Sequence, residues 1–129
     1  MNWGLLLRLS AFGAVMAIAT INFLPQTFEY IVWPFIFAFC AYAIAKNCED
    51  RLFIHGFMLS IINCIYIVAI HTAFFDMYAA AHNGWISSLP PGLNPRAMSA
   101  AYGVVAGIVS GIVLGIFCVL ANRMLKKPA

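Results

Sequence analysis

Charged side chains are scarce in this sequence of 129 residues: only 9% of the positions are charged, whereas 64% are hydrophobic. A soluble domain of this size needs a charged surface to stay in solution, so the balance excludes an ordinary water-soluble protein. The mean hydropathy of +0.95 indicates a chain whose solvent is the lipid bilayer. The net charge of +3 is too small and too scattered to indicate a nucleic-acid partner.

The motifs of common enzyme classes are also absent. The sequence has no Gly-rich phosphate loop, no Ser-His-Asp set, no H-E-x-x-H motif and no paired carboxylates. None of the four cysteines belongs to a C-x-x-C pair or has a histidine at metal-ligand spacing. His55 and His71 point to opposite sides of one predicted helix, so a single copy cannot hold a haem between them. We therefore predict a protein that is not an enzyme and has no cofactor.

Long apolar runs are what the sequence has in abundance. About 20 apolar residues in a helix cross the hydrocarbon core, and four runs are long enough. The predicted spans cover about residues 4–24, 29–46, 52–75 and 97–121. Asn94 followed by Pro95 is a strong start signal for the last span. Asn47 and Asp50 are candidate N-caps of the third.

These runs predict an all-α membrane protein, a single domain over residues 1–129 in which four transmembrane helices form an antiparallel bundle. The connections after the first and second spans are short, which favours antiparallel neighbours. Residues 76–96 form the one sizeable loop, on the outer side. Within it, residues 77–82 are compatible with an extension of the third helix, and residues 87–92 are expected to be irregular.

The basic residues indicate the orientation in the membrane. Only Arg96 lies on the outer side of the four-span arrangement. The six on the other side are Arg8, Lys46, Arg51, Arg123, Lys126 and Lys127. Since cytoplasmic segments carry an excess of Lys and Arg, both termini are predicted to face the cytoplasm, at a bacterial inner membrane. A competing interpretation takes the region up to residue 19 as a cleaved signal peptide, which would leave three spans.

The last span carries a row of small residues at a spacing of four. They are Ser99, Gly103, Gly107, Gly111 and Gly115. Residues four apart lie nearly above one another on a helix, so the row predicts a groove that admits another backbone. We expect the groove to be filled either by the small residues between Ser10 and Ala17 of the chain's own first helix, or by the same helix of a second copy.

A polar stripe follows one side of the third span. Ser60, Cys64, His71, Tyr78 and His82 lie within about 20° of one face, whereas Asn63 and Asp76 lie about 80° and about 140° from it at about 100° per residue. The candidate polar site consists of Ser60, Asn63, His71, Asp76, Tyr78 and His82. Exposing imidazole to lipid tails is costly, so the stripe should face the bundle interior or a wet cavity. Its outer end, where Glu29 is also expected, is interpreted as a proton-sensitive gate, as a metal site or as interfacial anchors.

Two functional hypotheses follow. The first is a helix-packing or assembly module, which self-associates through its glycine row or serves as an accessory subunit of a larger membrane complex. The alternative is a small channel or transporter whose outer mouth uses the candidate polar site. No Asp, Glu, Lys or Arg lies in the middle of a span, which disfavours a proton-coupled antiporter. The expected partners are the lipid bilayer and a second copy or a larger complex.

Overall fold

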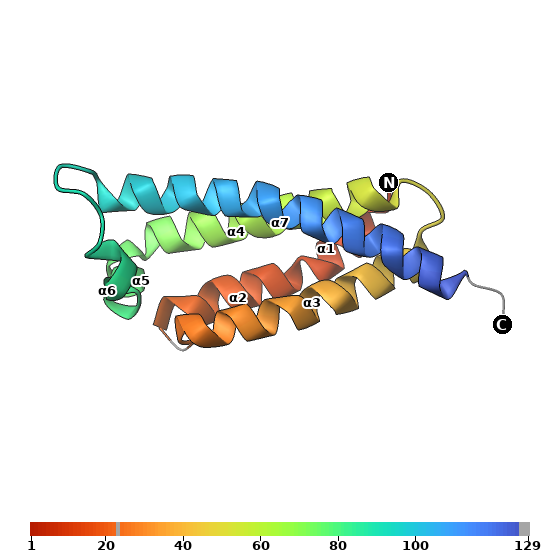
Figure 1. The fold of residues 1–129 in the computed structure, drawn as a ribbon, viewed down its shortest axis with the longest axis horizontal. Helices are drawn as coiled ribbons and strands as arrows, with labels where there is room; N and C mark the ends of the chain where they lie inside the picture. Colours follow the sequence, from red (N-terminus) through yellow and green to blue (C-terminus); the bar gives the residue numbers. More distant parts are fainter. Residues whose placement is uncertain (23, 127–129) are drawn as a thin grey trace.

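Figure 1 shows the computed structural model, which describes residues 1–22 and 24–126. Lys127, one of the basic residues counted above, lies outside the described residues. In the part of the chain that is described, every regular element is a helix. The helices are α1 (Trp3–Leu9), α2 (Ala11–Asn22), α3 (Gln26–Asn47), α4 (Leu52–Ala73), α5 (Phe75–Ala81), α6 (Asn83–Ile86) and α7 (Pro95–Leu125).

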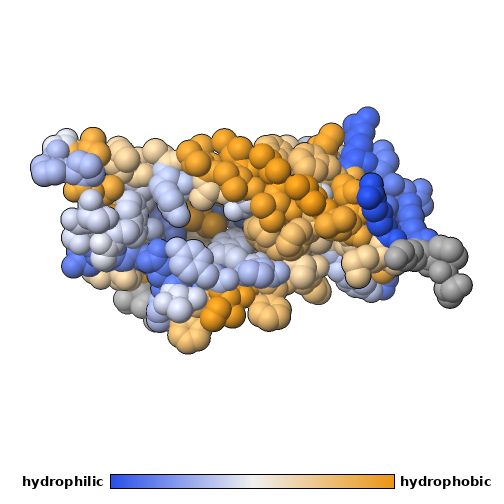
Figure 2. Space-filling model, viewed as in Figure 1, coloured by the Kyte–Doolittle hydropathy of each residue, from blue (hydrophilic) through white to orange (hydrophobic). Residues whose placement is uncertain are grey.

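Four helical segments are long and apolar enough to cross a membrane. They are Trp3–Ile21, which comprises α1 and most of α2, and the helices α3, α4 and α7. Many of their large apolar side chains are exposed on the surface of the chain. Figure 2 shows such side chains along the long helices and a group of hydrophilic ones toward the end with the C-terminus. Lipid tails accept an apolar surface, so this chain is consistent with an integral membrane protein.

The start of α7 follows the sequence signal. Pro95 occupies the first helical position, and the Oδ1 atom of Asn94 accepts hydrogen bonds from the backbone N–H of Arg96 at 3.0 Å and of Ala97 at 3.4 Å. These two N–H groups have no partner inside the helix. The prediction that Asn94 and Pro95 begin the last span is confirmed.

Replacing Asn94 by Ala is expected to lower the free energy of unfolding by about 1 kcal/mol, because it removes the acceptor for these two N–H groups. Unfolding by denaturing detergent, followed by circular dichroism, measures the change. Asn83→Ala is the matched control, since the Asn83 side chain is exposed and makes no hydrogen bond within the described residues. Equal losses in the two variants would contradict a capping role for Asn94.

The start of α4 differs from the prediction. Neither Asn47 nor Asp50 caps this helix. Asn47 ends α3 and donates from its side-chain amide to the carbonyl of Ala43 at 2.8 Å. The residue before α4 is Arg51, which has a left-handed backbone at φ 50°. Only four residues join the two helices, and the left-handed residue reverses the chain in so short a connection.

The glycine row of α7 packs against α4. A Cβ atom added at Gly107 would lie 2.5 Å from Cβ and Sγ of Cys64, and one at Gly103 would lie 2.7 Å from Cγ2 of Val68. Added Cβ atoms at Gly111 and Gly115 would lie 2.8 and 2.6 Å from the rings of Phe57 and Phe53. The groove predicted from the sequence is thus filled within the chain. The helix that fills it is α4, where the sequence analysis expected the first helix or a second copy.

The N-terminal segment packs on the other side of α4 (Figure 1). The position of Gly13 on α2 has no room for a Cβ atom because the Asn63 side chain lies against it. His55 is 1% exposed, and its Nε2 accepts from the backbone N–H of Asn2 at 2.9 Å while its Nδ1 lies 3.0 Å from the Arg51 carbonyl. Both ring nitrogens are satisfied, so His55 holds the chain's first residues against α4.

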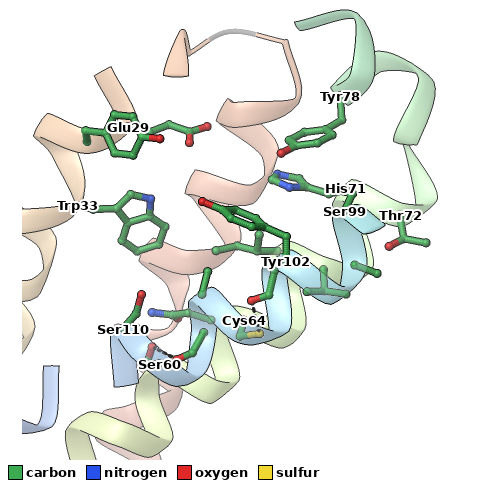
Figure 3. A pocket seen from close by; sticks show the side chains of 18 of the residues that line it. Glu29, Trp33, Ser60, Cys64, His71, Thr72, Tyr78, Ser99, Tyr102 and Ser110 are labelled. Carbon is green, nitrogen blue, oxygen red and sulfur yellow. Dashed lines mark hydrogen bonds between the residues drawn. The ribbon is translucent and has the colours of Figure 1, made fainter. Parts of the chain in front are cut away.

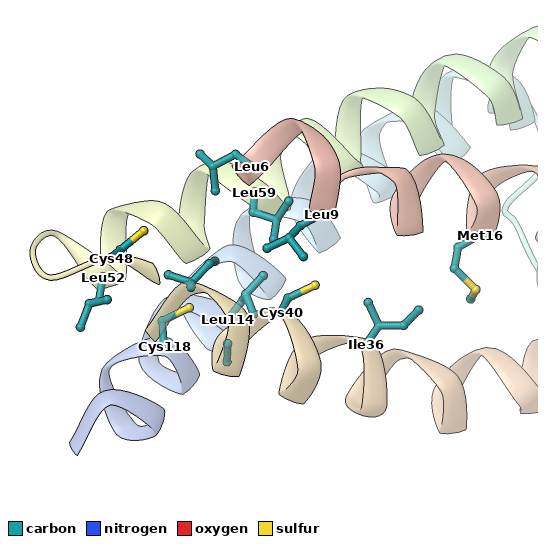
Figure 4. Packing of buried hydrophobic residues seen from close by; sticks show 12 residues of the cluster. Leu6, Leu9, Met16, Ile36, Cys40, Cys48, Leu52, Leu59, Leu114 and Cys118 are labelled. Carbon is teal, nitrogen blue, oxygen red and sulfur yellow. The ribbon is translucent and has the colours of Figure 1, made fainter. Parts of the chain in front are cut away.

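Buried apolar side chains fill the half of the bundle where α3 ends and α4 begins (Figure 4). Leu6, Leu59 and Leu114 are 0% exposed and come from α1, α4 and α7. Cys40 and Cys118 are buried among them. These side chains close this half of the molecule against water and small solutes.

Candidate functional site

The opposite half of the bundle contains a cavity of about 360 Å³ between α3, α4 and α7. Figure 2 shows a hollow between these helices, in the half of the molecule that carries α5 and α6. Polar and aromatic side chains from four helices line it. Among them are Glu29, Trp33, Asn63, His71, Tyr78 and Tyr102, five of which are labelled in Figure 3.

The cavity brings together four of the six residues of the candidate polar site. Ser60, Asn63, His71 and Tyr78 line it. His82 lies directly behind Tyr78, with the two rings stacked at a centroid distance of 4.3 Å. Asp76 is exposed in the first turn of α5 and is not among the lining residues. Asp76 follows His71 by five positions in the sequence, which at about 100° per residue already places Asp76 on a different face of a helix.

Two members of the polar stripe also tie α4 to α7. Ser60 donates from Oγ to the Gly107 carbonyl at 3.1 Å, and Cys64 donates from Sγ to the Gly103 carbonyl at 3.3 Å. The absent side chains at these glycines let α4 approach closely enough for both bonds. Cys64 therefore makes a specific polar contact with α7.

His71 connects the cavity to α2. Its Nε2 lies 2.7 Å from Oγ1 of Thr20, and the Thr20 hydroxyl donates to the carbonyl of Met16 at 2.8 Å. Since that hydroxyl has one proton, Nε2 of His71 donates and the Thr20 oxygen accepts. The His71 ring also stacks on Tyr78 at a centroid distance of 4.3 Å. His71, Tyr78 and His82 thus form one continuous column of rings from the cavity outward.

At the outer end of this column, His82 faces Glu29. Nδ1 of His82 lies 3.1 Å from the Tyr78 carbonyl oxygen, which can only accept, so Nδ1 carries a proton. Nε2 lies 3.4 Å from Oε1 of Glu29, and in the described residues neither atom has a hydrogen-bond partner. Two lone pairs would repel at this distance, so one further proton belongs to the pair.

Charge and burial agree with a proton held between His82 and Glu29. The side chains are 2% and 20% exposed, respectively. Interaction with the Glu29 carboxylate raises the pKa of His82 above its ordinary value of 6.5, against the opposing effect of burial. Burial raises the pKa of Tyr78 as well, which keeps its phenol neutral. The histidine, rather than the tyrosine, is the group of the outer column that exchanges a proton near neutral pH.

Asn63 lies between the cavity and α2. It lines the cavity, but its Oδ1 atom lies against the position of Gly13 on α2. That atom is buried and has no hydrogen-bond partner in the described part of the chain. A buried amide group without a partner costs about 1–3 kcal/mol.

Three residues of the site were not singled out from the sequence. Thr20 shares the α2 face of Gly13 and Ala17, and that spacing would have placed it on the packed side of the helix with them. Trp33 follows Glu29 by one helical turn, so the two share a face of α3. Tyr102 precedes Gly103 at the edge of the glycine row. In each case the spacing shows which face of its own helix the residue occupies, but the sequence does not say which other helix that face contacts.

Comparison with protein-family models, with curated proteins and with solved structures gave no match.

Proposed function

We propose that this protein binds a small solute inside the membrane, as a small channel or transporter does, and that the cavity between α3, α4 and α7 is the solute site. The observation that carries the proposal is a cavity of about 360 Å³ whose lining combines apolar side chains with Glu29, His71 and Tyr102. Sites for small molecules are concave, mostly apolar and equipped with a few polar groups. This cavity has those properties.

A gated site is supported better than an open pore. The cavity lies in one half of the bundle, and the cluster of Leu6, Leu59 and Leu114 closes the other half. A solute that crosses the membrane through this site needs those side chains to separate. Alternating access to a single site is how transporters work, so a transporter fits this arrangement more closely than a channel does.

We also propose that the four spans form an antiparallel bundle with both termini in the cytoplasm of a bacterial cell. The excess of Lys and Arg near the termini and in the connection between α3 and α4 supports this orientation. With it, the cavity, α5 and α6 lie toward the outer face of the membrane. The solute then has access from outside the cell.

The assembly role predicted first stays a prediction. It was inferred from the glycine row of α7, which was expected to receive a partner helix. In the structure α4 packs against that row, so the row no longer indicates a second copy or another protein. The polar cavity is the feature that a packing role does not account for, and it favours the solute-binding function.

The proposed function predicts that some class of small solute stabilises the protein. The purified full chain in a mild detergent is heated in the presence of small amines, alcohols, amides and carboxylates. At a concentration 100 times its Kd, a bound solute adds about 2.7 kcal/mol to the free energy of unfolding. The same solute should slow the reaction of Cys64, which lines the cavity, with a maleimide.

Asn63→Leu should weaken the stabilisation, because it replaces a polar side chain that lines the cavity by an apolar one of similar size. Asn47→Leu is the matched control at the other end of the bundle, where the side chain is exposed. If no solute class stabilises the parent protein or protects Cys64, the cavity is not a solute site.

A further inference from the structure

One wall of the cavity combines a single carboxylate with several aromatic rings. Glu29 and Trp33 extend from α3, Tyr102 from α7 and Tyr78 from α5 (Figure 3). Tyr30 also lines the cavity, and neither Lys nor Arg is among its lining residues. The site therefore offers negative charge and ring faces without a fixed positive charge.

Aromatic faces attract cations because the ring quadrupole is negative above and below the plane. The attraction is strongest for Trp and grows when the cation has left water, as it has inside a cavity between helices. A carboxylate beside the rings supplies the counter-charge. Together these groups select against anions and favour a cation over a neutral molecule of the same shape.

The lining further distinguishes an organic cation from a metal ion. Phe37, Ile67 and Val68 contribute apolar surface to the same cavity. Among the described residues, no group of three or more His, Cys, Asp and Glu side chains could hold a metal ion. An alkylated ammonium group is weakly hydrated and can place its methyl groups on rings and aliphatic side chains, whereas a metal ion needs several oxygen or nitrogen ligands.

We propose that the solute is an organic cation, an alkylated ammonium group with a small apolar body, held by Glu29 and by the rings of Trp33 and Tyr102, and that it exchanges with the proton shared by Glu29 and His82. The inference rests on the proposed function, since it takes the cavity as the solute site. The apolar body lies against Phe37, Ile67 and Val68, which line the same cavity.

The exchange follows from the single carboxylate. With His82 protonated, Glu29 is already neutralised by an imidazolium 3.4 Å away, and an arriving cation is repelled by that imidazolium. When the cation binds to Glu29, His82 releases the proton on Nε2 to water and keeps the one on Nδ1. One positive charge enters and one leaves, so the net charge of the site is unchanged. Glu29, near the outer end of α3, is the only carboxylate that this exchange requires.

The other titratable groups around the pair come from four helices. They are Tyr30 of α3, His71 of α4 and Tyr102 of α7, with Tyr78 of α5 between the two histidines. α2 contributes Thr20, which does not titrate in water. Since Glu29 raises the pKa of His82, the proton competes with the cation up to pH values above 6.5. Cation affinity should thus increase about tenfold per pH unit below that pKa and level off above it.

Isothermal titration calorimetry of the full chain in mild detergent tests the inference, with benzyltrimethylammonium as the probe and benzenesulfonate as the anion of similar size. We expect the cation to bind and the anion not to bind. In two buffers of different ionisation enthalpy, the heats should reveal release of about one proton per cation at about pH 6 and almost none at about pH 9. His82→Gln should bind the cation without releasing a proton.

Glu29→Gln keeps the shape of the side chain, and we expect it to weaken cation binding by about tenfold or more. Glu49→Gln, in the connection before α4, is the matched control and should leave cation binding unchanged. Trp33→Leu should weaken binding by about tenfold, whereas Trp3→Leu should leave it unchanged. Failure of benzyltrimethylammonium to bind, or equal affinity in the Glu29 and Glu49 variants, overturns the inference. If neutral solutes still stabilise the protein, the proposed function survives that result.

Discussion

The double variant Gly107→Leu, Gly111→Leu is expected to lose the contact between α4 and α7 and with it the folded bundle. A Cβ atom alone at Gly107 would lie 2.5 Å from Cys64, and one at Gly111 would lie 2.8 Å from Phe57. Overpacking by single methyl groups already costs about 1–3 kcal/mol, and leucine adds three further carbons at each site. Thermal unfolding in detergent, followed by circular dichroism, measures the loss.

Gly84→Leu is the control, because nothing lies within 4 Å of an added Cβ atom at Gly84. A sharper test enlarges the side chain at position 107 of α7 and then shortens the side chain at position 64 of α4, which it contacts. Gly107→Ala should destabilise the protein, and adding Cys64→Gly should recover part of the loss by removing the two atoms that the new methyl group meets. A double-mutant coupling of about 1 kcal/mol or more supports direct contact. Purely additive losses, or a double leucine variant that melts like the parent, would refute this packing.

Raising the pH is expected to loosen α5 and α6 from α3. The pKa of His82 is raised in the folded chain, so its pairing with Glu29 contributes stability that is fully present below the ordinary value of 6.5 and is lost as the pH rises through the raised value. The two atoms lie 3.4 Å apart without a hydrogen bond, and an ion pair of this kind contributes about 1 kcal/mol. Its loss corresponds to about fivefold more frequent opening.

Hydrogen exchange of the α5 amides, corrected for the intrinsic effect of pH, measures this opening between about pH 6 and about pH 9. Glu29→Gln should give fast exchange at both pH values, since the pair is absent throughout. Asp76 is an exposed carboxylate on α5 itself, and the Asp76→Asn variant should behave like the parent protein. Exchange in the parent that does not change between the two pH values would mean that the pair does not hold α5 in place.

The candidate site could be predicted from the sequence only in part. The helical spacing of Ser60 and His71 predicted that both face the interior, because exposing polar groups to lipid tails is costly, and both line the cavity. Asp76 was included for its place near the end of the third span, although at about 100° per residue it lies about 140° from His71, and it is exposed and does not line the cavity. Trp33 and Tyr102 became part of the site only through the contact between α3 and α7, which no local pattern encodes.

Four long apolar helices were readable from the amino-acid sequence alone, because the length and hydropathy that let a segment cross a bilayer are properties of that segment. The start of α7 at Asn94 and Pro95 is local in the same way. Which helix meets which face was decided by the tertiary structure. An apolar helix face is about as stable against lipid tails as against another helix, so apolar character alone does not choose a neighbour. Close packing at the glycines of α7 favours α4 as its neighbour. That choice leaves the cavity beside α3 and brings Glu29 to His82.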